Sequence, residues 1–80
     1  MKIIALNLPR DLSEDELAKL FKEHGAVDSC DLIMDTNTGI SKGFGFIEMP
    51  VAEEAEAAIA ALHGTKINKS KIRVKPSTQN

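Results

Sequence analysis

Proline and glycine divide this chain into six short segments, and this punctuation limits the possible folds more than any other feature. The breaks fall at Pro9, Gly25, Pro50 and Gly64, and at the turn-forming sequence DTNTG, residues 35–39. Each segment is long enough for one strand or one helix, and none approaches the roughly 20 apolar residues of a membrane-spanning helix. The 80 residues therefore predict one domain with a thin core, formed by packing these segments on one another.

Hydrophobic periodicity separates four strand-like segments from two helical ones. Strands are predicted at residues 2–8, 27–34, 41–49 and 71–75, with Cys30, Leu32 and Met34 alternating on one side of the second. Helices are predicted at residues 13–24 and 51–63, with His24 and His63 in their last turns. Ser13 followed three residues later by Glu16 is the capping-box pattern that starts a helix.

The resulting order, βαββαβ, predicts an α+β fold of the ferredoxin-like type. Such a fold has a four-stranded antiparallel sheet with both helices on one face, and its other face is open to water. The domain is expected to span residues 1–76, with a disordered tail at residues 77–80.

Strand alternation places two of the three aromatic residues on this open face. In the segment SKGFGFIEM, residues 41–49, Ile47 and Met49 suit the side beneath the helices, so Phe44 and Phe46 point to water. The same alternation adds Lys2, Ile4 and Leu6 from the first strand, Asp31 and Ile33 from the second, Lys42 and Glu48 from the third, and Lys71, Arg73 and Lys75 from the fourth. Ile3, Ala5, Leu8, Ile72 and Val74 are expected to point inward.

The charge distribution gives this open face a basic character that the whole chain lacks. The net charge is −2, but residues 1–65 carry −7 and residues 66–80 carry +5. Five cations are expected on the open face against Asp31 and Glu48. Exposed phenyl rings among cations are typical of surfaces that bind single-stranded nucleic acid, because bases stack on the rings and phosphates meet the cations.

Two segments carry a resemblance to a known family. KGFGFIEM, residues 42–49, resembles the ribonucleoprotein octamer of the RNA recognition motif: its first five residues match, Ile47 is a conservative replacement, and Met49 departs from the pattern. IIALNL, residues 3–8, resembles the shorter hexamer of the first strand, with Asn7 and Leu8 in place. The resemblance extends along the whole chain. The chain resembles stand-alone bacterial members of the family, and an excised domain of a larger protein would look much the same.

The resemblance implies a role for individual residues. Phe46 would stack under one base, Phe44 would lie against the sugars between two nucleotides, and Lys42 would pair with a phosphate. Ile4 stands where the hexamer normally has a second stacking aromatic, so it offers apolar contact but no stacking of rings. Leu6, where the family often has glycine, adds a further apolar side chain. The expected RNA-binding residues are Lys2, Ile4, Leu6, Asn7, Lys42, Phe44, Phe46, Lys71, Arg73 and Lys75.

Enzymatic and metal-dependent functions find little support in the sequence. A hydrolase of acyl phosphates on the same topology would need a glycine-lined anion cradle after the first strand, and LPRDL supplies only Arg10. The single cysteine, Cys30, is expected to be a small core residue and permits no internal disulfide. No enzyme activity, metal or cofactor is expected.

The sequence thus predicts a monomeric, cytoplasmic protein that binds single-stranded RNA across its sheet, in post-transcriptional regulation or as an RNA chaperone. Single-stranded DNA is an alternative ligand, because a stacking platform accepts both nucleic acids. A second hypothesis is a protein-interaction module on the same fold, suggested by the sequence pI of 5.6 and the missing hexamer aromatic. No membrane association is expected.

Overall fold

A computed structural model describes residues 1–39 and 41–77, with Ser41 described in its backbone alone. The elements follow in the order β1 (Lys2–Leu6), α1 (Glu14–Lys22), β2 (Ser29–Met34), β3 (Ser41–Glu48), α2 (Ala52–Leu62), β4 (Lys66–Ile67), β5 (Ser70–Lys71) and β6 (Arg73–Pro76). Neither helix in this part of the chain has the length and apolar character that crossing a membrane requires.

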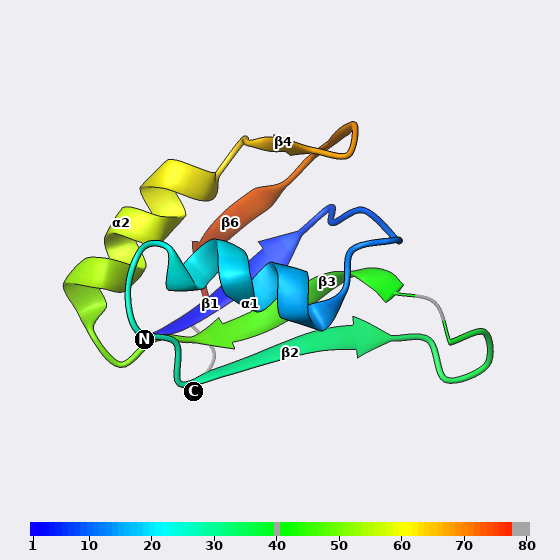
Figure 1. The fold of residues 1–80 in the computed structure, drawn as a ribbon, viewed down its shortest axis with the longest axis horizontal. Helices are drawn as coiled ribbons and strands as arrows, with labels where there is room; N and C mark the ends of the chain where they lie inside the picture. The colour runs from blue at the N-terminus through cyan, green and yellow to red at the C-terminus, as the bar shows by residue number, and fades with distance from the viewer. Residues whose placement is uncertain (40, 78–80) are drawn as a thin grey trace.

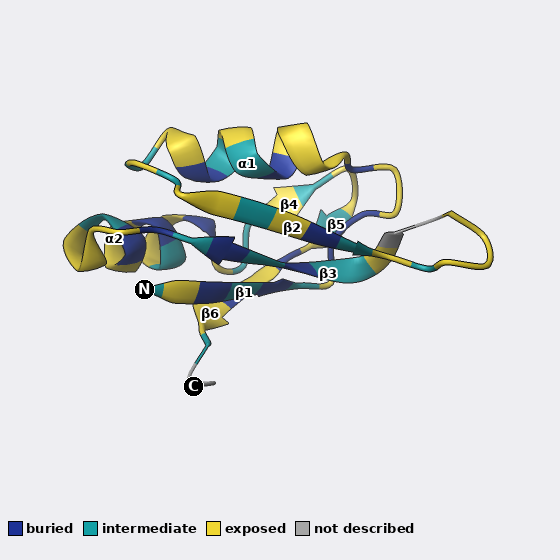
Figure 2. Ribbon diagram, turned by 90° about the horizontal axis from the view of Figure 1, so that it is seen from below, coloured by how far each residue is buried: buried dark blue, intermediate teal, exposed yellow. Residues whose placement is uncertain are grey.

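The main sheet has four antiparallel strands in the order β2-β3-β1-β6. Helix α1 contacts β2 and helix α2 contacts β6. In Figure 1 helix α1 crosses in front of the middle of the sheet. Strands β3 and β1 lie in the middle and carry many of the buried segments of the sheet, whereas the edge strand β6 is mainly exposed (Figure 2). The predicted ferredoxin-like βαββαβ fold is confirmed, with β4 and β5 added as a small hairpin before the last strand.

Helix α1 begins where the capping box predicts. The Ser13 hydroxyl accepts a hydrogen bond from the Glu16 backbone N–H at 3.1 Å, and the Glu16 carboxylate accepts one from the Ser13 N–H at 3.1 Å. Both helices are slightly shorter than predicted, so His24 and His63 lie just beyond the last turns instead of within them. Helix α2 begins after Val51 without a side-chain cap.

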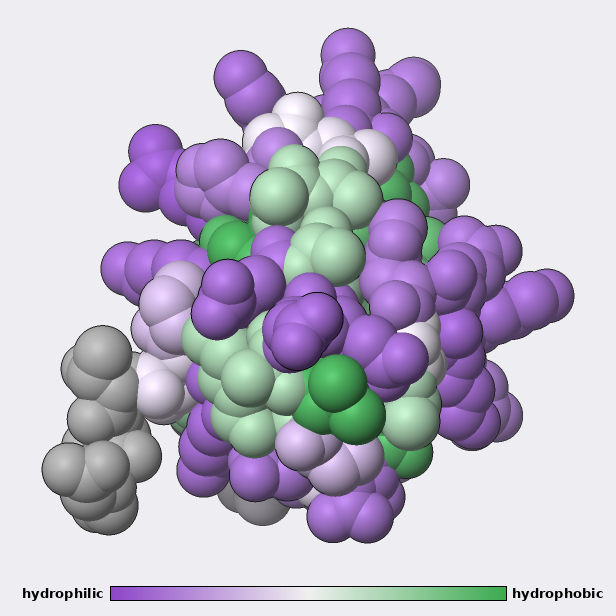
Figure 3. All heavy atoms as spheres, turned by 90° about the vertical axis from the view of Figure 1, so that its left-hand side faces the viewer, coloured by the Kyte–Doolittle hydropathy of each residue, from purple (hydrophilic) through white to green (hydrophobic). Residues whose placement is uncertain are grey.

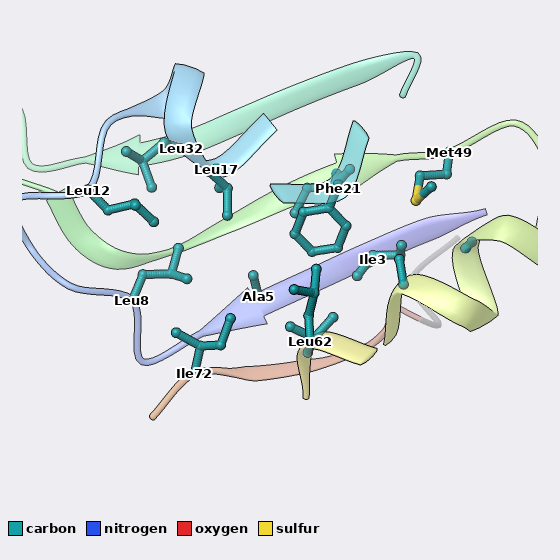
Figure 4. Packing of buried hydrophobic residues seen from close by; sticks show 14 residues of the cluster. Ile3, Ala5, Leu8, Leu12, Leu17, Phe21, Leu32, Met49, Leu62 and Ile72 are labelled. Atoms are coloured by element: carbon teal, nitrogen blue, oxygen red, sulfur yellow. The ribbon is translucent and has the colours of Figure 1, made fainter. Parts of the chain in front are cut away.

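A single hydrophobic core lies between the sheet and both helices. Figure 4 shows Leu17 and Phe21 of α1 and Leu62 of α2 pointing toward Ile3 and Ala5 of β1. The fully buried large side chains are Phe21, Ile3, Leu17, Ile47, Met49, Ile72 and Val74. Burying a side chain of this size stabilises the fold by about 1.5–3 kcal/mol, so the core depends on a small number of residues.

Glycine at position 45 allows the close packing of this core. A Cβ atom there would lie 2.7 Å from the carbonyl oxygen of Asp31 and 3.2 Å from Cδ2 of Leu17. Strand β3 therefore approaches both β2 and α1 too closely for a side chain at this point.

A bulge in the β2–β3 pair corrects the prediction for Met34. The register runs regularly as far as Leu32 and then shifts before Met34, because β3 holds extra residues there. Gly43 lies in this segment of β3 with a φ of +87°, a conformation that favours glycine. Met34 lies beyond the bulge and is 46% exposed, so it does not continue the inward side formed by Leu32.

The ends of the outer strands also differ from the prediction. Strand β1 stops at Leu6, because Asn7 adopts a left-handed conformation with a φ of +59°, and this change of direction lets Leu8 turn inward. The predicted strand at residues 71–75 is divided between β5 and β6 at Ile72. Of the predicted tail, residues 78–80 lie outside the described residues, and the Ser77 N–H donates to the Lys2 carbonyl at 2.8 Å.

The β4–β5 hairpin has no counterpart in the prediction. Its strands have two residues each, too few to show a periodic pattern. The connecting residues Asn68 and Lys69 have φ angles of +46° and +73°, as a type I′ turn requires. The second of these positions usually holds glycine, and a lysine there hid the turn from sequence analysis.

Candidate nucleic-acid interface

Two rows of side chains cross the open face of the sheet, because paired residues of neighbouring strands lie side by side. The first row contains Asp31, Phe46, Ile4 and Lys75, one from each strand. The second row contains Phe44, Leu6 and Arg73. Residues from distant parts of the sequence thus meet on one surface, the platform, which we define as Lys2, Ile4, Leu6, Phe44, Phe46, Arg73 and Lys75.

Burial shows that the platform lies opposite the core. The neighbours of its residues along each strand, Ile3, Ala5, Ile47 and Val74, are 0–1% exposed. Phe44, Phe46, Ile4 and Leu6 keep intermediate exposure, and Lys2, Arg73 and Lys75 are exposed. Since successive strand residues point to opposite faces, the platform side chains face away from the helices.

The two phenyl rings of the platform form an edge-to-face pair. Their centroids lie 6.2 Å apart with an interplanar angle of 88°. The ammonium group of Lys2 lies over the Phe46 ring, 5.0 Å from its centroid, in a cation–π contact. The pair therefore presents two ring surfaces in different orientations, one of them already in contact with a cation.

The bulge at Gly43 separates Lys42 from the rings. The carbonyl of Gly43 accepts a hydrogen bond from the Leu8 N–H at 2.8 Å, which holds this turn of β3 against the segment after β1. Lys42 is exposed and lies beyond the regular register, outside both rows. The structure thus brings seven of the ten predicted binding residues together on the platform and leaves Lys42 at its margin, while Asn7 follows β1. Lys71 was predicted on the open face of the sheet, but it lies in β5 of the hairpin, because the last strand is divided at Ile72.

Asn7 links the platform to the β4–β5 hairpin. Its side-chain amide donates a hydrogen bond of 2.7 Å to the carbonyl of Lys71. This bond joins the end of β1 to β5 across 64 positions of sequence. Asn7 therefore has a structural contact in addition to the binding role that the family resemblance implies.

Acidic and hydroxyl groups border the platform near β2. Phe46 and Lys2 line a hollow of about 160 Å³ with Ser29, Asp31 and Glu48. The carboxylates can accept hydrogen bonds from donor groups, so this side of the platform differs chemically from the basic side at β6.

His63 is a residue near the platform whose partner the sequence did not indicate. Its Nδ1 atom lies 3.1 Å from the backbone nitrogen and 3.0 Å from the carbonyl oxygen of Val74 in the edge strand β6, so it bonds the backbone of Val74 as acceptor or as donor according to its tautomer. In the sequence its place near the end of α2 suggested only an interaction with the helix dipole. The bond joins residues 11 positions apart, and no local pattern predicts such a pair.

Cys30 has the environment of a packing residue. The pKa of its thiol is raised from 9.0 to about 11, chiefly by burial and then by the carboxylates of Glu14 and Asp31, while Lys22 acts in the opposite direction. The thiol is therefore neutral at pH 7 and a poor nucleophile. In the described part of the chain, no group of three or more His, Cys, Asp or Glu side chains could hold a metal ion.

Comparison with known proteins agrees with this geometry. Residues 5–73 match the family model described as RNA recognition motif. The chain is 41% identical to the protein RbpA from Synechocystis sp., with the matched region covering 91% of this chain and 79% of that protein. It spans only 25–29% of the length of several relatives that it matches from Spinacia oleracea and Arabidopsis thaliana.

Solved structures share the same fold. The crystal structure of RNA-binding protein PG1 has a TM-score of 0.93 and 36% identity, covering 100% of this chain and 96% of that one. The structure of the Rna15 RRM with bound RNA (GU) has a TM-score of 0.90 and 26% identity, covering 98% of this chain and 83% of that one. With the octamer on β3, the hexamer on β1 and the four-stranded sheet that displays them, the chain belongs to the RNA recognition motif family.

Proposed function

We propose that the chain binds single-stranded RNA on the platform, through base stacking on Phe46 and Phe44 and phosphate contacts with the surrounding cations. The observation that carries this proposal is the partly exposed edge-to-face ring pair among Lys2, Arg73 and Lys75. A similar solved structure that holds RNA on the same fold supports it. Such binding suits a role in post-transcriptional regulation or as an RNA chaperone.

The family also bears on catalysis. RNA recognition motifs are binding modules and not enzymes, so the prediction that the chain has no enzymatic activity is confirmed. The chemistry of the proposed site is accordingly stacking, hydrogen bonding and charge neutralisation.

Lys2 gives the proposed binding a defined first step. Its ammonium group lies 5.0 Å from the centroid of the Phe46 ring, where a stacked base would lie. A base that stacks on this ring displaces the ammonium, which then meets a phosphate of the same strand. The cation–π contact is thus replaced by a stacking contact with the base and a charge-assisted contact with the phosphate. This exchange favours the bound state, because stacking on an aromatic side chain stabilises binding by about 1–3 kcal/mol per base.

The aliphatic part of the platform limits the expected affinity. Ile4 is the Cα partner of Phe46, and Leu6 is the partner of Phe44. Both offer apolar contact to a base or a sugar but no π-face. We therefore expect two to four nucleotides to bind with modest affinity and weak sequence preference.

The test is a titration of short random-sequence RNA against the wild type, Phe46→Ala and Phe46→Tyr. Phe46→Ala is expected to weaken binding by about 1–3 kcal/mol, roughly 5- to 150-fold, because it removes one stacking surface. Phe46→Tyr keeps the ring and is the matched control, with affinity near that of the wild type. Equal affinity of Phe46→Ala and the wild type at low salt would refute the stacking model.

Salt dependence tests the cationic part of the same proposal. With about 3–5 phosphate contacts, log K is expected to fall with log[salt] at a slope of roughly −2 to −3.5. A flat response would exclude a role for Lys2, Arg73 and Lys75 in phosphate binding. Matched single-stranded DNA in the same titration shows whether a 2′-hydroxyl is recognised.

Protein interaction is the second candidate function, and a hollow between α1 and the β4–β5 hairpin favours it. The hollow has a volume of about 250 Å³ and combines Leu12, Leu20 and Ile67 with charged residues of α1. The surface at the α2 end of the molecule is a less suitable contact area for a protein, because hydrophilic residues there surround only small apolar patches (Figure 3). A partner that survives nuclease treatment and Phe46→Ala but is lost in Leu20→Glu would support this function; loss on nuclease treatment would argue against it.

A further inference from the structure

A basic groove lies beyond the edge of the sheet at β6. Its volume is about 520 Å³, and it is lined by Asn7, His63, Gly64, Lys71, Ile72, Arg73 and Lys75. Its charged residues are all cations, with no carboxylate among those that line it. It is therefore chemically distinct from the hollow at β2, where Asp31 and Glu48 face the other side of the platform.

Two hydrogen bonds hold the walls of this groove in place. His63 is anchored to β6 by the hydrogen bond between its Nδ1 atom and the backbone of Val74. On the other wall, the Asn7 amide donates to the Lys71 carbonyl at 2.7 Å. The Asn7 bond joins positions 64 apart, so the groove combines the residue that follows β1 with residues 63–75, which supply the rest of its lining.

The groove continues the platform. Lys75 and Arg73 line the groove and also end the two rows that run from the phenyl rings. Lys75 is the Cα partner of Ile4, which is in turn the partner of Phe46. A polynucleotide that leaves Phe46 along this row reaches the edge of the sheet beside the groove.

We propose that the groove binds a phosphate of a nucleotide that flanks those stacked on the platform, with Lys71 and His63 as contacts that the platform itself lacks. This inference rests on the proposed RNA binding and extends it past the sheet edge. The phosphate is either an internal phosphodiester or a terminal phosphomonoester, since both present anionic oxygens to the same cations.

The experiment compares RNA of two nucleotides with RNA of six, using NMR titration of the wild type, Lys71→Gln and Lys66→Gln. Lys66 is the Cα partner of Lys71 in the hairpin, carries the same charge, and does not line the groove, so it is the matched control. Both side chains are exposed, and circular dichroism would verify that each variant is folded.

The proposal predicts a loss that depends on RNA length. For six nucleotides, Lys71→Gln is expected to reduce the salt slope by about 0.7, the contribution of one phosphate on a single strand. At 0.1 M salt this corresponds to a loss of affinity of about fivefold. For two nucleotides, which the platform alone accommodates, the affinity is expected to stay unchanged. His63→Gln should repeat this length dependence.

Failure of this inference is distinguishable from failure of the proposed function. If Phe46→Ala weakens binding but Lys71→Gln affects both RNA lengths equally, or no more than Lys66→Gln does, the groove is not a phosphate site and the platform proposal stands. If Phe46→Ala leaves binding unchanged, the proposed function itself fails and the inference fails with it. Trinucleotides with and without a terminal phosphate separate the two sources of the phosphate. If the terminal phosphate raises the affinity and Lys71→Gln abolishes this gain, the groove binds a phosphomonoester. If the length effect occurs without such a gain, the groove binds a phosphodiester.

Discussion

Residues 44–47 of strand β3 alternate between the two faces of the sheet, and the side chains on the two faces have different environments. On one side Gly45 and Ile47 are buried against α1 and β2, and a single additional carbon at position 45 would lie 2.7 Å from a backbone oxygen. On the other side Phe44 and Phe46 keep intermediate exposure and touch each other edge to face. The side that holds the fold together thus has little space for change, while the side proposed to bind RNA carries the larger side chains.

This difference means that stability and binding can be altered separately. Side chains beneath the helices contribute through burial, whereas those of the platform are available for contacts outside the protein. Changes on the buried side should alter the free energy of unfolding, and changes on the open side should alter affinity.

The largest effect is expected from truncation on the buried side. Ile47→Ala should lower the free energy of unfolding by about 2–5 kcal/mol, because it removes a side chain that is 0% exposed and leaves a cavity. Urea denaturation measures this loss. Ile47→Val, which costs about 0.5–1.5 kcal/mol, should remain folded and bind RNA like the wild type. A loss of RNA affinity in folded Ile47→Val would contradict the prediction that stability and binding can be altered separately.

Cys30 of strand β2, the Cα partner of Ile47, tests whether the buried side of the sheet is shielded from solvent. Because the pKa of its thiol is raised to about 11 from 9.0, alkylation by iodoacetamide at pH 8 should be about 100-fold slower in the folded protein than in the urea-unfolded chain. Because the pKa of the thiol is higher in the folded protein, ionisation of Cys30 disfavours the folded state. The free energy of unfolding therefore keeps the full contribution of the neutral thiol below pH 9 and loses it as the pH rises through 11. Equal alkylation rates would show that Cys30 is not shielded.

A gain of affinity is expected from a new ring on the open side. Ile4→Phe places an aromatic side chain opposite Phe46 and supplies the π-face that the platform lacks at this position. We expect RNA affinity to rise by about fivefold, the lower end of the stacking range, with little change in stability. Ile4→Leu is the control, since it keeps the apolar contact without a ring. No difference between these two variants would indicate that bases do not reach position 4.

The smallest effect concerns the hairpin, which belongs to neither side of β3. Lys69→Gly should raise the free energy of unfolding by about 1 kcal/mol, because glycine adopts the φ of +73° without strain. A thermal melt should show a midpoint about 4–8 °C higher. Lys69→Gln removes the same charge and keeps the strain, so any change of affinity shared by both variants reports on charge alone. A stability gain in Lys69→Gln would contradict the strain argument.

Prediction from sequence succeeded where a local pattern carries the information. The capping box located the start of α1 at Ser13, and alternation placed Ile47 inward and Phe46 outward. It failed for Met34, because the bulge that shifts the register arises between two strands and leaves no signal within β2. It also missed the β4–β5 hairpin, whose strands are too short for a periodic pattern.

The sequence alone determined the order of the two helices and the four strands of the main sheet, the family, and which two rings lie on the open face, since these follow from periodicity and from motifs of adjacent residues. Only the tertiary structure decided which cations and acids stand beside each ring, and that His63 and Asn7 build a basic groove at β6. The physical reason is the distance along the sequence over which each interaction acts. Alternation and capping act between residues a few positions apart, whereas strand register, bulges and backbone bonds between strands join residues as far apart as Lys2 and Ser77.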